Sequence, residues 1–261
     1  MTMPRLIAVA SGKGGVGKTW LAITLAQALA QSGAQTGRRV LLVDGDMGLA
    51  NIDIQLGLGD IADIGQVTCG AKTLAQIIHP FPSGGFAVAA GRSGTGTLAS
   101  LPHAAITALI AQIRCQNFSD IILDLGAGLD RATRTLASAA DTLLVLATDE
   151  PTSLTDAYAV LKIANQDNPG QDMQIVINQA STPATGARTY AALTRATHAF
   201  LHLTPKLAGI VRADAHVRDA IRRQSPLLTR HPTSAAAQDV QAIARILSAA
   251  PPQEHTATPT K

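Results

Sequence analysis

Short runs of aliphatic residues recur along the chain, and turn-forming residues bound most of them. Most runs are apolar at every position and do not alternate with polar residues, which is typical of strands buried on both faces of a parallel sheet. The predicted strands are residues 6–10, 40–43, 86–90, 121–123, 142–147, 174–177 and 206–210. A sheet of this kind needs helices on both of its faces.

Longer, alanine-rich stretches separate most of these runs and carry the apolar spacing of helices. The predicted helices are residues 19–31, 103–114, 131–139, 153–165, 185–200, 217–223 and 235–249. Regular alternation of strand and helix predicts the α/β class, with a doubly wound, mostly parallel sheet and right-handed crossovers. Because no linker or repeat divides the pattern, we expect one domain over residues 1–250 and a disordered tail at residues 251–261.

The composition narrows the class of protein further. Hydrophobic residues make up 46% of the 261 residues and charged residues 15%, which excludes a disordered chain. Seven aromatic residues argue against a nucleic-acid surface of stacked rings, and a net charge of +3 attracts polyanions only weakly. Cys69 and Cys115 fit no metal or disulfide spacing, and no apolar run is long enough for a transmembrane helix. We therefore expect a cytoplasmic protein.

A glycine-rich segment follows the first predicted strand and leads directly into a helix. Glycines let successive backbone N–H groups approach phosphate oxygens, and the helix directs its positive end at the same anion. Lys18 is expected to reach the β- and γ-phosphates of a nucleotide, and the Thr19 hydroxyl to bind Mg²⁺. The segment that satisfies this phosphate-loop pattern is Gly12, Lys13, Gly14, Gly15, Val16, Gly17, Lys18 and Thr19.

Aspartates follow two of the predicted strands. Asp44 and Asp46 come directly after residues 40–43, and Asp124 comes directly after residues 121–123. The carboxyl ends of parallel strands line the crevice in which open α/β sheets bind ligands. Asp124 is therefore predicted to be the aspartate that holds Mg²⁺ through the water shell of the ion.

Lys13 sets the loop apart, because turn geometry does not explain a second lysine inside it. Residues 13–19, Lys-Gly-Gly-Val-Gly-Lys-Thr, are identical to the deviant phosphate loop of the MinD/ParA family, which the chain resembles over nearly its whole length. In that family the early lysine of one subunit reaches the phosphates of the other. The resemblance thus implies an ATP-dependent homodimer, ATP and Mg²⁺ as cofactors, and catalytic roles for Lys13 and Lys18.

The resemblance also implies roles for polar residues after the strands. Asp44 matches an additional aspartate near Mg²⁺, and Asp46 matches the catalytic aspartate that positions the attacking water. Asn178 matches the asparagine that recognises the base, with an amide that can donate and accept at once. Asp46 and Asn178 could also serve only as cap and turn residues, which are common roles at strand ends.

Two further candidates concern the base of the nucleotide. Residues 209–214 resemble the family segment that lines the base pocket, but Arg212 stands where proline is usual, which weakens the case for Asp214. Trp20 occupies a position where the family usually has a small or polar residue. It is expected either to pack on the first helical turn or to stack on the nucleotide.

Two segments narrow the resemblance to one branch of the family. Residues 46–58 resemble the switch I region of MinD-type proteins, and residues 149–158 resemble the start of a dimer-facing helix in FlhG-type regulators of flagellar number. The implied function is an ATPase switch that dimerises on ATP and resets on hydrolysis, recruited to the cell pole or inner membrane surface. The implied partners are an FlhF-type GTPase, basal-body components or a transcription regulator.

Three other functions remain open. A ParA-like partition protein could bind DNA through Arg218, Arg222 and Arg223, joined by Arg188 and Arg195, although the small net charge and the nearby Asp214 and Asp219 favour a solvated charged face. A MinD-type regulator of the division site is the second. A metabolic phosphate-loop enzyme or metallocluster carrier is the third, and the chain shows no paired-cysteine motif for the carrier.

Two departures from the branch limit what the resemblance implies. The first strand begins at residue 6, so we expect no N-terminal arm that stimulates an FlhF-type GTPase. The last helix has a single cation, Arg245, whereas helices that lie on membranes are rich in lysine and arginine. We therefore expect Val240, Ile243 and Leu247 to pack against the sheet, with weak or partner-assisted membrane contact.

Overall fold

A computed structural model of the chain describes residues 3–46, 50–91 and 101–249. Residues 47–49 of the predicted switch I segment and the predicted tail at residues 251–261 lie outside these ranges. The expected division into one domain and a disordered tail stays a prediction.

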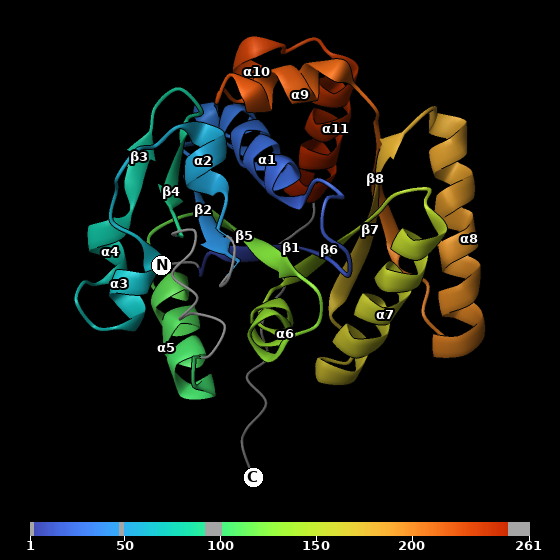
Figure 1. The fold of residues 1–261 in the computed structure, drawn as a ribbon, viewed down its shortest axis with the longest axis horizontal. Coiled ribbons are helices and arrows are strands. Elements are labelled where there is room, and N and C mark those ends of the chain that lie inside the picture. Colours follow the sequence, from blue (N-terminus) through green and yellow to red (C-terminus); the bar gives the residue numbers. More distant parts are fainter. Residues whose placement is uncertain (1–2, 47–49, 92–100, 250–261) are drawn as a thin grey trace.

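Eight strands in the described ranges form one sheet, and the predicted α/β class is confirmed (Figure 1). The strand order is β3-β4-β2-β5-β1-β6-β7-β8, and every neighbouring pair is parallel except β3 and β4. Parallel neighbours need crossover connections, which the intervening helices supply. The strands are β1 (Arg5–Ser11), β2 (Val40–Gly45), β3 (His79–Phe81), β4 (Phe86–Ala89), β5 (Asp120–Ala127), β6 (Thr142–Ala147), β7 (Asp172–Ala180) and β8 (Lys206–Arg212).

Helices cover both faces of the sheet, as Figure 1 shows. The first group lies with the core on one face: α1 (Lys18–Ser32), α2 (Ile52–Leu56), α9 (Ala215–Arg222), α10 (Leu227–Arg230) and α11 (Ala235–Ala249). The second group covers the other face: α3 (Ile64–Thr68), α4 (Leu74–Ile77), α5 (His103–Arg114), α6 (Arg131–Ser138), α7 (Pro151–Asp167) and α8 (Pro183–Leu201). A 3₁₀ turn, Ala34–Thr36, follows α1.

The central strand β1 shows how the sheet divides the core. Leu6 and Ala8 point to the cluster under the second group of helices, while Ile7 and Val9 point to the cluster under α1 and α11. All four side chains are fully buried. Successive side chains of a strand face opposite sides, so continuous apolar runs supply both cores at once.

Each predicted strand and helix has a counterpart, and the missed elements are short. β3 was not predicted because it has three residues, includes Pro80 and pairs antiparallel at the edge of the sheet. The helices α2, α3, α4 and α10 have four or five residues, too few for a helical period to emerge from the sequence.

The last helix packs as predicted. Val240, Ile243 and Leu247 are buried, and α11 lies against α1 and β8. In the described part of the chain, no helix combines the length and the hydrophobicity that crossing a bilayer would require.

Candidate nucleotide-binding site

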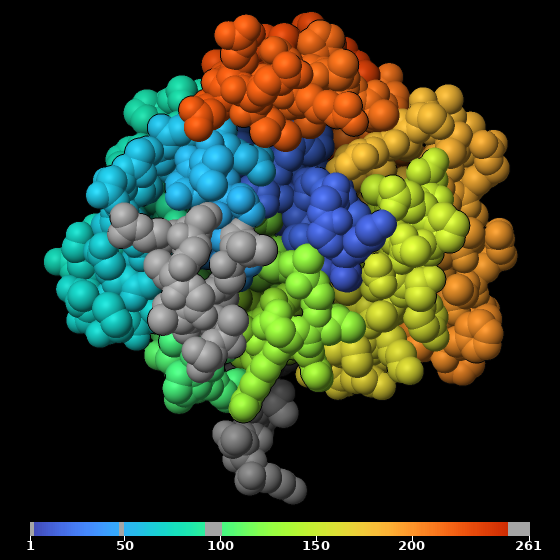
Figure 2. All heavy atoms as spheres, viewed as in Figure 1, coloured from blue at the N-terminus to red at the C-terminus, as the bar shows by residue number. Residues whose placement is uncertain are grey.

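The glycine-rich loop connects the end of β1 to the start of α1. In the space-filling view, its dark blue atoms lie near the centre of one face, between α2, the orange α9–α10 segment and the yellow-green start of α7 (Figure 2). Gly15 and Gly17 have φ angles of 80° and 93°, in the left-handed region that side chains disfavour. Within the described ranges no side chain caps α1, so its first turn is open to an anion at the loop.

Asn178, at the end of β7, holds this loop in place. Its amide nitrogen donates to the backbone carbonyl of Val16 at 2.7 Å, and the side chain is buried. A Cβ added at Gly17 would lie 2.6 Å from the same nitrogen, so only glycine fits there. One N–H of the Asn178 amide is therefore already committed, and the amide oxygen and the other N–H remain for a ligand.

The start of α7 contacts the other end of the loop. A Cβ at Gly12 would lie 2.6 Å from the Cβ of Asp156, which makes glycine necessary at position 12. The Lys13 ammonium lies 2.6 Å from Glu150 Oε2 and 3.1 Å from Thr152 Oγ1. In this conformation the charge of Lys13 is thus paired at the surface, on the segment that opens α7.

Asp44 and Asp124 lie side by side at the carboxyl ends of neighbouring strands, where β2 and β5 pair them in register. Both are buried. Asp44 accepts backbone N–H bonds from Asp46, Asn51 and Ile52 at 3.1–3.3 Å. Asp124 Oδ1 is buried and has no hydrogen-bond partner among the residues that the structure describes. Leaving such an oxygen unsatisfied is costly, so Asp124 Oδ1 is available to a ligand.

Burial and mutual repulsion leave these carboxylates poorly stabilised. Burial raises the pKa of Asp44 to about 7, against the partial compensation of the three backbone N–H bonds. Burial, and then the nearby charge of Asp44, raise the pKa of Asp124 to about 8. Burial also lowers the pKa of the Lys18 amine, which Asp124 and Asp46 partly counteract. We call Lys18, Asp44, Asp46 and Asp124 the strand-end cluster.

This cluster fits a hydrated divalent cation. A cation would supply the partner that Asp124 Oδ1 lacks and relieve the repulsion between the two buried carboxylates. Within the described ranges no three acidic, histidine or cysteine side chains converge as a metal cage. Mg²⁺ keeps several waters and binds through one or two carboxylates plus phosphate oxygens, so the neighbouring pair Asp44 and Asp124 can supply its protein ligands.

Thr19 lies next to the strand-end cluster, and Asp46 extends it toward Gly126. The Thr19 hydroxyl lies close enough to Asp124 to oppose the rise of its pKa, which places this hydroxyl beside the proposed metal position. The Asp46 carboxylate lies against Gly126, where an added Cβ would approach it to 3.3 Å. The loop, Asp44, Asp46 and Asp124 are thus brought together, while their roles in binding and catalysis stay predictions.

A cavity of about 560 Å³ lies next to the loop. Trp20 is 6% exposed, packs in the core under α1 and contributes to the cavity wall, so packing accounts for most of its surface. Gln179 was not predicted, because nothing local distinguishes it from other strand-end glutamines. The cavity is lined by Gly15, Gly17, Trp20, Asn178, Gln179, Arg212, Ala213, Asp214, Ala215, Val217, Arg218 and Ile221.

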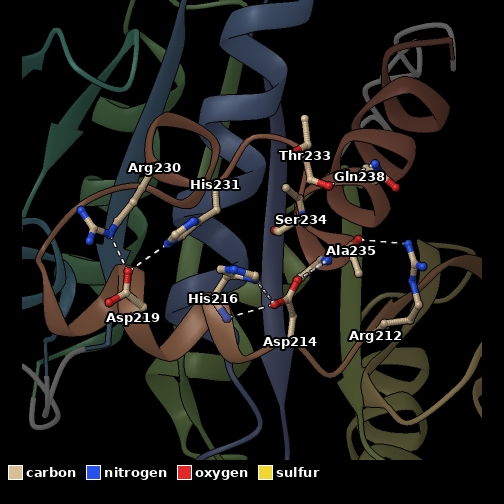
Figure 3. Close-up of polar contacts among 12 residues, drawn as sticks. Arg212, Asp214, His216, Asp219, Arg230, His231, Thr233, Ser234, Ala235 and Gln238 are labelled. Atoms are coloured by element: carbon tan, nitrogen blue, oxygen red, sulfur yellow. Dashed lines mark hydrogen bonds and ion pairs between the residues drawn. The ribbon is translucent and has the colours of Figure 1, made fainter.

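Asp214 lies at the edge of this cavity, but its oxygens cap two helices. Oδ1 accepts from the His216 backbone at the start of α9, and Oδ2 accepts from the Ala236 backbone at the start of α11 (Figure 3). Burial alone would raise the pKa of Asp214, but these bonds and the His216 ring outweigh it and lower the pKa to about 2. The predicted base contact by Asp214 therefore competes with a structural task.

A second paired carboxylate lies close by on α9. Asp219 accepts from the Arg230 and His231 side chains, and these bonds lower its pKa to about 2. The rings of His216 and His231 lie 4.4 Å apart between the two carboxylates (Figure 3). We call Asp214, His216, Asp219, Arg230 and His231 the α9 cluster.

Arg212, which departs from the expected proline, forms an ion pair across to α11. Its guanidinium donates to both oxygens of Asp239 at 2.8 Å, and its backbone N–H donates to Asp239 at 2.9 Å. A proline could supply none of these bonds. Arg212 thus connects the cavity wall to α11 through its hydrogen bonds with Asp239.

Comparison with known proteins agrees with the site geometry. Residues 7–227 match the family model described as "CobQ/CobB/MinD/ParA nucleotide binding domain". The antiactivator FleN of Pseudomonas aeruginosa is 35% identical over 92% of this chain and 85% of its own length. The flagellum site-determining protein YlxH of Helicobacter pylori is 28% identical over 93% of this chain and 81% of its own.

A solved structure shares the fold. The septum site-determining protein MinD from Pyrococcus horikoshii, solved with Mg-ADP, matches 95% of this chain and 97% of its own with a TM-score of 0.78. At 22% sequence identity, this likeness concerns the fold alone.

Proposed function

The chain belongs to the CobQ/CobB/MinD/ParA family of nucleotide-binding ATPases, and we propose that it is a switch that dimerises on binding Mg-ATP and resets on hydrolysis. The observation that carries this proposal is the strand-end cluster beside an uncapped helix. The pair of buried carboxylates with raised pKa values and an orphaned oxygen is costly unless a cation completes it. A cation held next to a phosphate-binding loop favours a nucleoside triphosphate.

Each residue of the site then has a task. The loop and the Lys18 ammonium bind and orient the phosphates, while Thr19 and Asp124 hold Mg²⁺, with Asp44 behind them. When bound, Mg²⁺ supplies charge neutralisation for the transferring phosphoryl group. Asp46, against Gly126, orients the attacking water and is a candidate to take its proton.

Lys13 would complete the site from the opposite subunit. Its pairing with Glu150 and Thr152 holds its ammonium on the start of α7, at the molecular surface. Exchange of these exposed partners for phosphate oxygens of a second subunit costs little, because exposed ion pairs are weak. Dimerisation would thus depend on bound triphosphate. Hydrolysis would remove the phosphate oxygens that Lys13 contacts in the opposite subunit, and the dimer would dissociate.

The biological role we propose is control of flagellar number and placement. The chain is homologous to FleN, an antiactivator, and to YlxH, a flagellum site-determining protein. The partners we propose are an FlhF-type GTPase, basal-body components or a transcription regulator. We propose a cytoplasmic protein, recruited to the cell pole or the inner membrane surface.

Light scattering of the purified chain tests the switch. With Mg-ATP, the Asp46→Ala variant should form a stable dimer, because turnover is blocked. Adding Lys13→Ala should restore the monomer, whereas Lys162→Ala, an exposed lysine on α7, should leave the dimer intact. An Asp46→Ala chain that binds Mg-ATP but stays monomeric would refute the proposal.

A ParA-like DNA-binding protein is the second candidate. Arg218 and Arg222 are exposed on α9, which is the observation in its favour. ATP-dependent retardation of nonspecific DNA that weakens steeply with salt would support it. Absence of retardation at low salt would dispose of it.

A further inference from the structure

Gln179 adopts a conformation that only glycine adopts freely. Its φ angle is 58°, and it lies where β7 carries one residue more than β8, between the pairs Ile177–Ile210 and Ala180–Arg212. Such bulges redirect a side chain, and backbone strain of this kind concentrates at functional sites. The bulge brings Gln179 to the cavity, because Gln179 forms part of the cavity wall.

The amides of Asn178 and Gln179 converge on the phosphate loop. A Cβ added at Gly17 would lie 2.6 Å from the Asn178 amide nitrogen and 3.9 Å from the Gln179 amide nitrogen. The first nitrogen is committed to the Val16 carbonyl at 2.7 Å. The Gln179 amide is exposed, and among the residues described here it forms no side-chain hydrogen bond.

The two amides are therefore complementary in what they can offer a ligand. Asn178 keeps its oxygen, which can accept from an amino group, but only one N–H, since the other is donated to Val16. An adenine edge presents an amino group flanked by two ring nitrogens that accept, so it can use more donors than the single N–H that Asn178 has left. Gln179 is the adjacent side chain whose donor nitrogen is unused.

We propose that Gln179 is a base-reading residue that acts together with Asn178. The Asn178 oxygen accepts from the 6-amino group of adenine, and the Gln179 nitrogen donates to one of the two ring nitrogens that flank it, N1 or N7. A 6-oxo purine would instead place its oxygen against the Asn178 oxygen. This inference rests on the proposed nucleotide-binding function and assigns it a selectivity for adenine.

The test measures competition of ATP, ITP, 1-deaza-ATP and 7-deaza-ATP against a fluorescent ATP analogue. The wild-type chain should bind ITP and one of the two deaza analogues about five-fold to ten-fold more weakly than ATP, as expected for one lost hydrogen bond. Gln179→Gly removes the amide and relieves the strained φ angle, so the fold should persist. This variant should bind that deaza analogue as well as it binds ATP.

Arg218→Ala is the matched control, because Arg218 lines the same cavity and also carries donors. It should retain the discrimination that Gln179→Gly loses. The inference is overturned if neither deaza analogue is discriminated, if Gln179→Gly keeps the discrimination, or if Arg218→Ala alone abolishes it. A wild-type chain that binds no nucleoside triphosphate would instead refute the proposed function itself.

Discussion

The strand-end cluster and the α9 cluster are both rich in aspartate, yet their electrostatics are opposite. Asp44 and Asp124 are buried together, and their pKa values rise to about 7 and about 8. Asp214 and Asp219 each accept hydrogen bonds from donors within the chain, and their pKa values fall to about 2. The fold leaves an oxygen of the strand-end cluster without a hydrogen-bond partner among the described residues, whereas it supplies donors to both carboxylates of the α9 cluster.

The difference teaches where ligand binding should be sought. A carboxylate whose charged form is destabilised by burial persists in a protein only where another interaction offsets this cost. A bound cation and phosphate would offset it in the strand-end cluster. Groups that gain stability need no ligand to explain them. The wall of the cavity contains residues of both kinds. Asn178 and Gln179 have polar atoms available for a ligand, whereas both oxygens of Asp214 accept hydrogen bonds within the chain.

The largest effect is expected from Lys18→Met, which should lower the rate of ATP hydrolysis by about 100-fold or more. The buried ammonium is the cation of the strand-end cluster, and methionine keeps only its apolar stem. Arg230→Ala removes a cation of the α9 cluster and serves as the control, with a rate within about twofold of wild type. A phosphate-release assay measures both, and equal losses would erase the distinction between the clusters.

The next effect concerns the stability of the nucleotide-free chain. A carboxyl whose pKa rises on folding binds more protons in the folded state, so stability should fall by several kcal/mol as the pH rises from about 4 to about 8. Urea unfolding across this range, without Mg²⁺, measures it. Asp124→Asn should flatten the slope, and a slope that is unchanged in this variant would contradict our view of the cluster.

The α9 cluster should show the opposite sign in acid. Because the pKa of Asp214 is lowered to about 2, its contribution is complete above about pH 4 and is lost as the pH falls toward 2. At pH 7, Asp214→Ala should lower the free energy of unfolding by about 1–2 kcal/mol, since two helices lose a cap. Asp214→Ser, which can still cap α9, should recover part of this loss; no recovery would argue against capping.

The smallest effect is expected from Asp219→Asn. Asp219 and its partners Arg230 and His231 are partly exposed, and ion pairs between exposed groups stabilise little. The urea midpoint of this variant should match that of wild type within error. A clearly lower urea midpoint would mean that the hydrogen bonds of the α9 cluster depend on one another. The α9 cluster would then contribute more to the stability of the fold than we expect.

Much of the site could be predicted because its signals are local. Residues 12–19 are contiguous, and Asp44 and Asp124 each follow an apolar run that ends in the crevice of a parallel sheet. Strand register then places the two carboxylates side by side, as the ends of neighbouring parallel strands require.

The parts that could not be predicted depend on contacts between distant segments. Asn178 donates an amide N–H to the backbone carbonyl of Val16, 162 residues away, and Asp214 accepts from the backbone N–H of Ala236, 22 residues away. Neither pairing leaves a mark in the sequence around it. The left-handed conformation of Gln179 arises from the mismatch between β7 and β8, which only the folded sheet defines.

The close approach of Gly12 to Asp156 has a consequence for how such chains can diverge. A methyl group at position 12 would meet the backbone and Cβ of α7, so it could be accommodated only if α7 shifted as a body. The residue type at position 12 is therefore constrained by the position of the α7 backbone, although the two segments lie in different halves of the chain. Among homologues, we expect any non-glycine residue at position 12 to accompany a displaced or shortened start of α7.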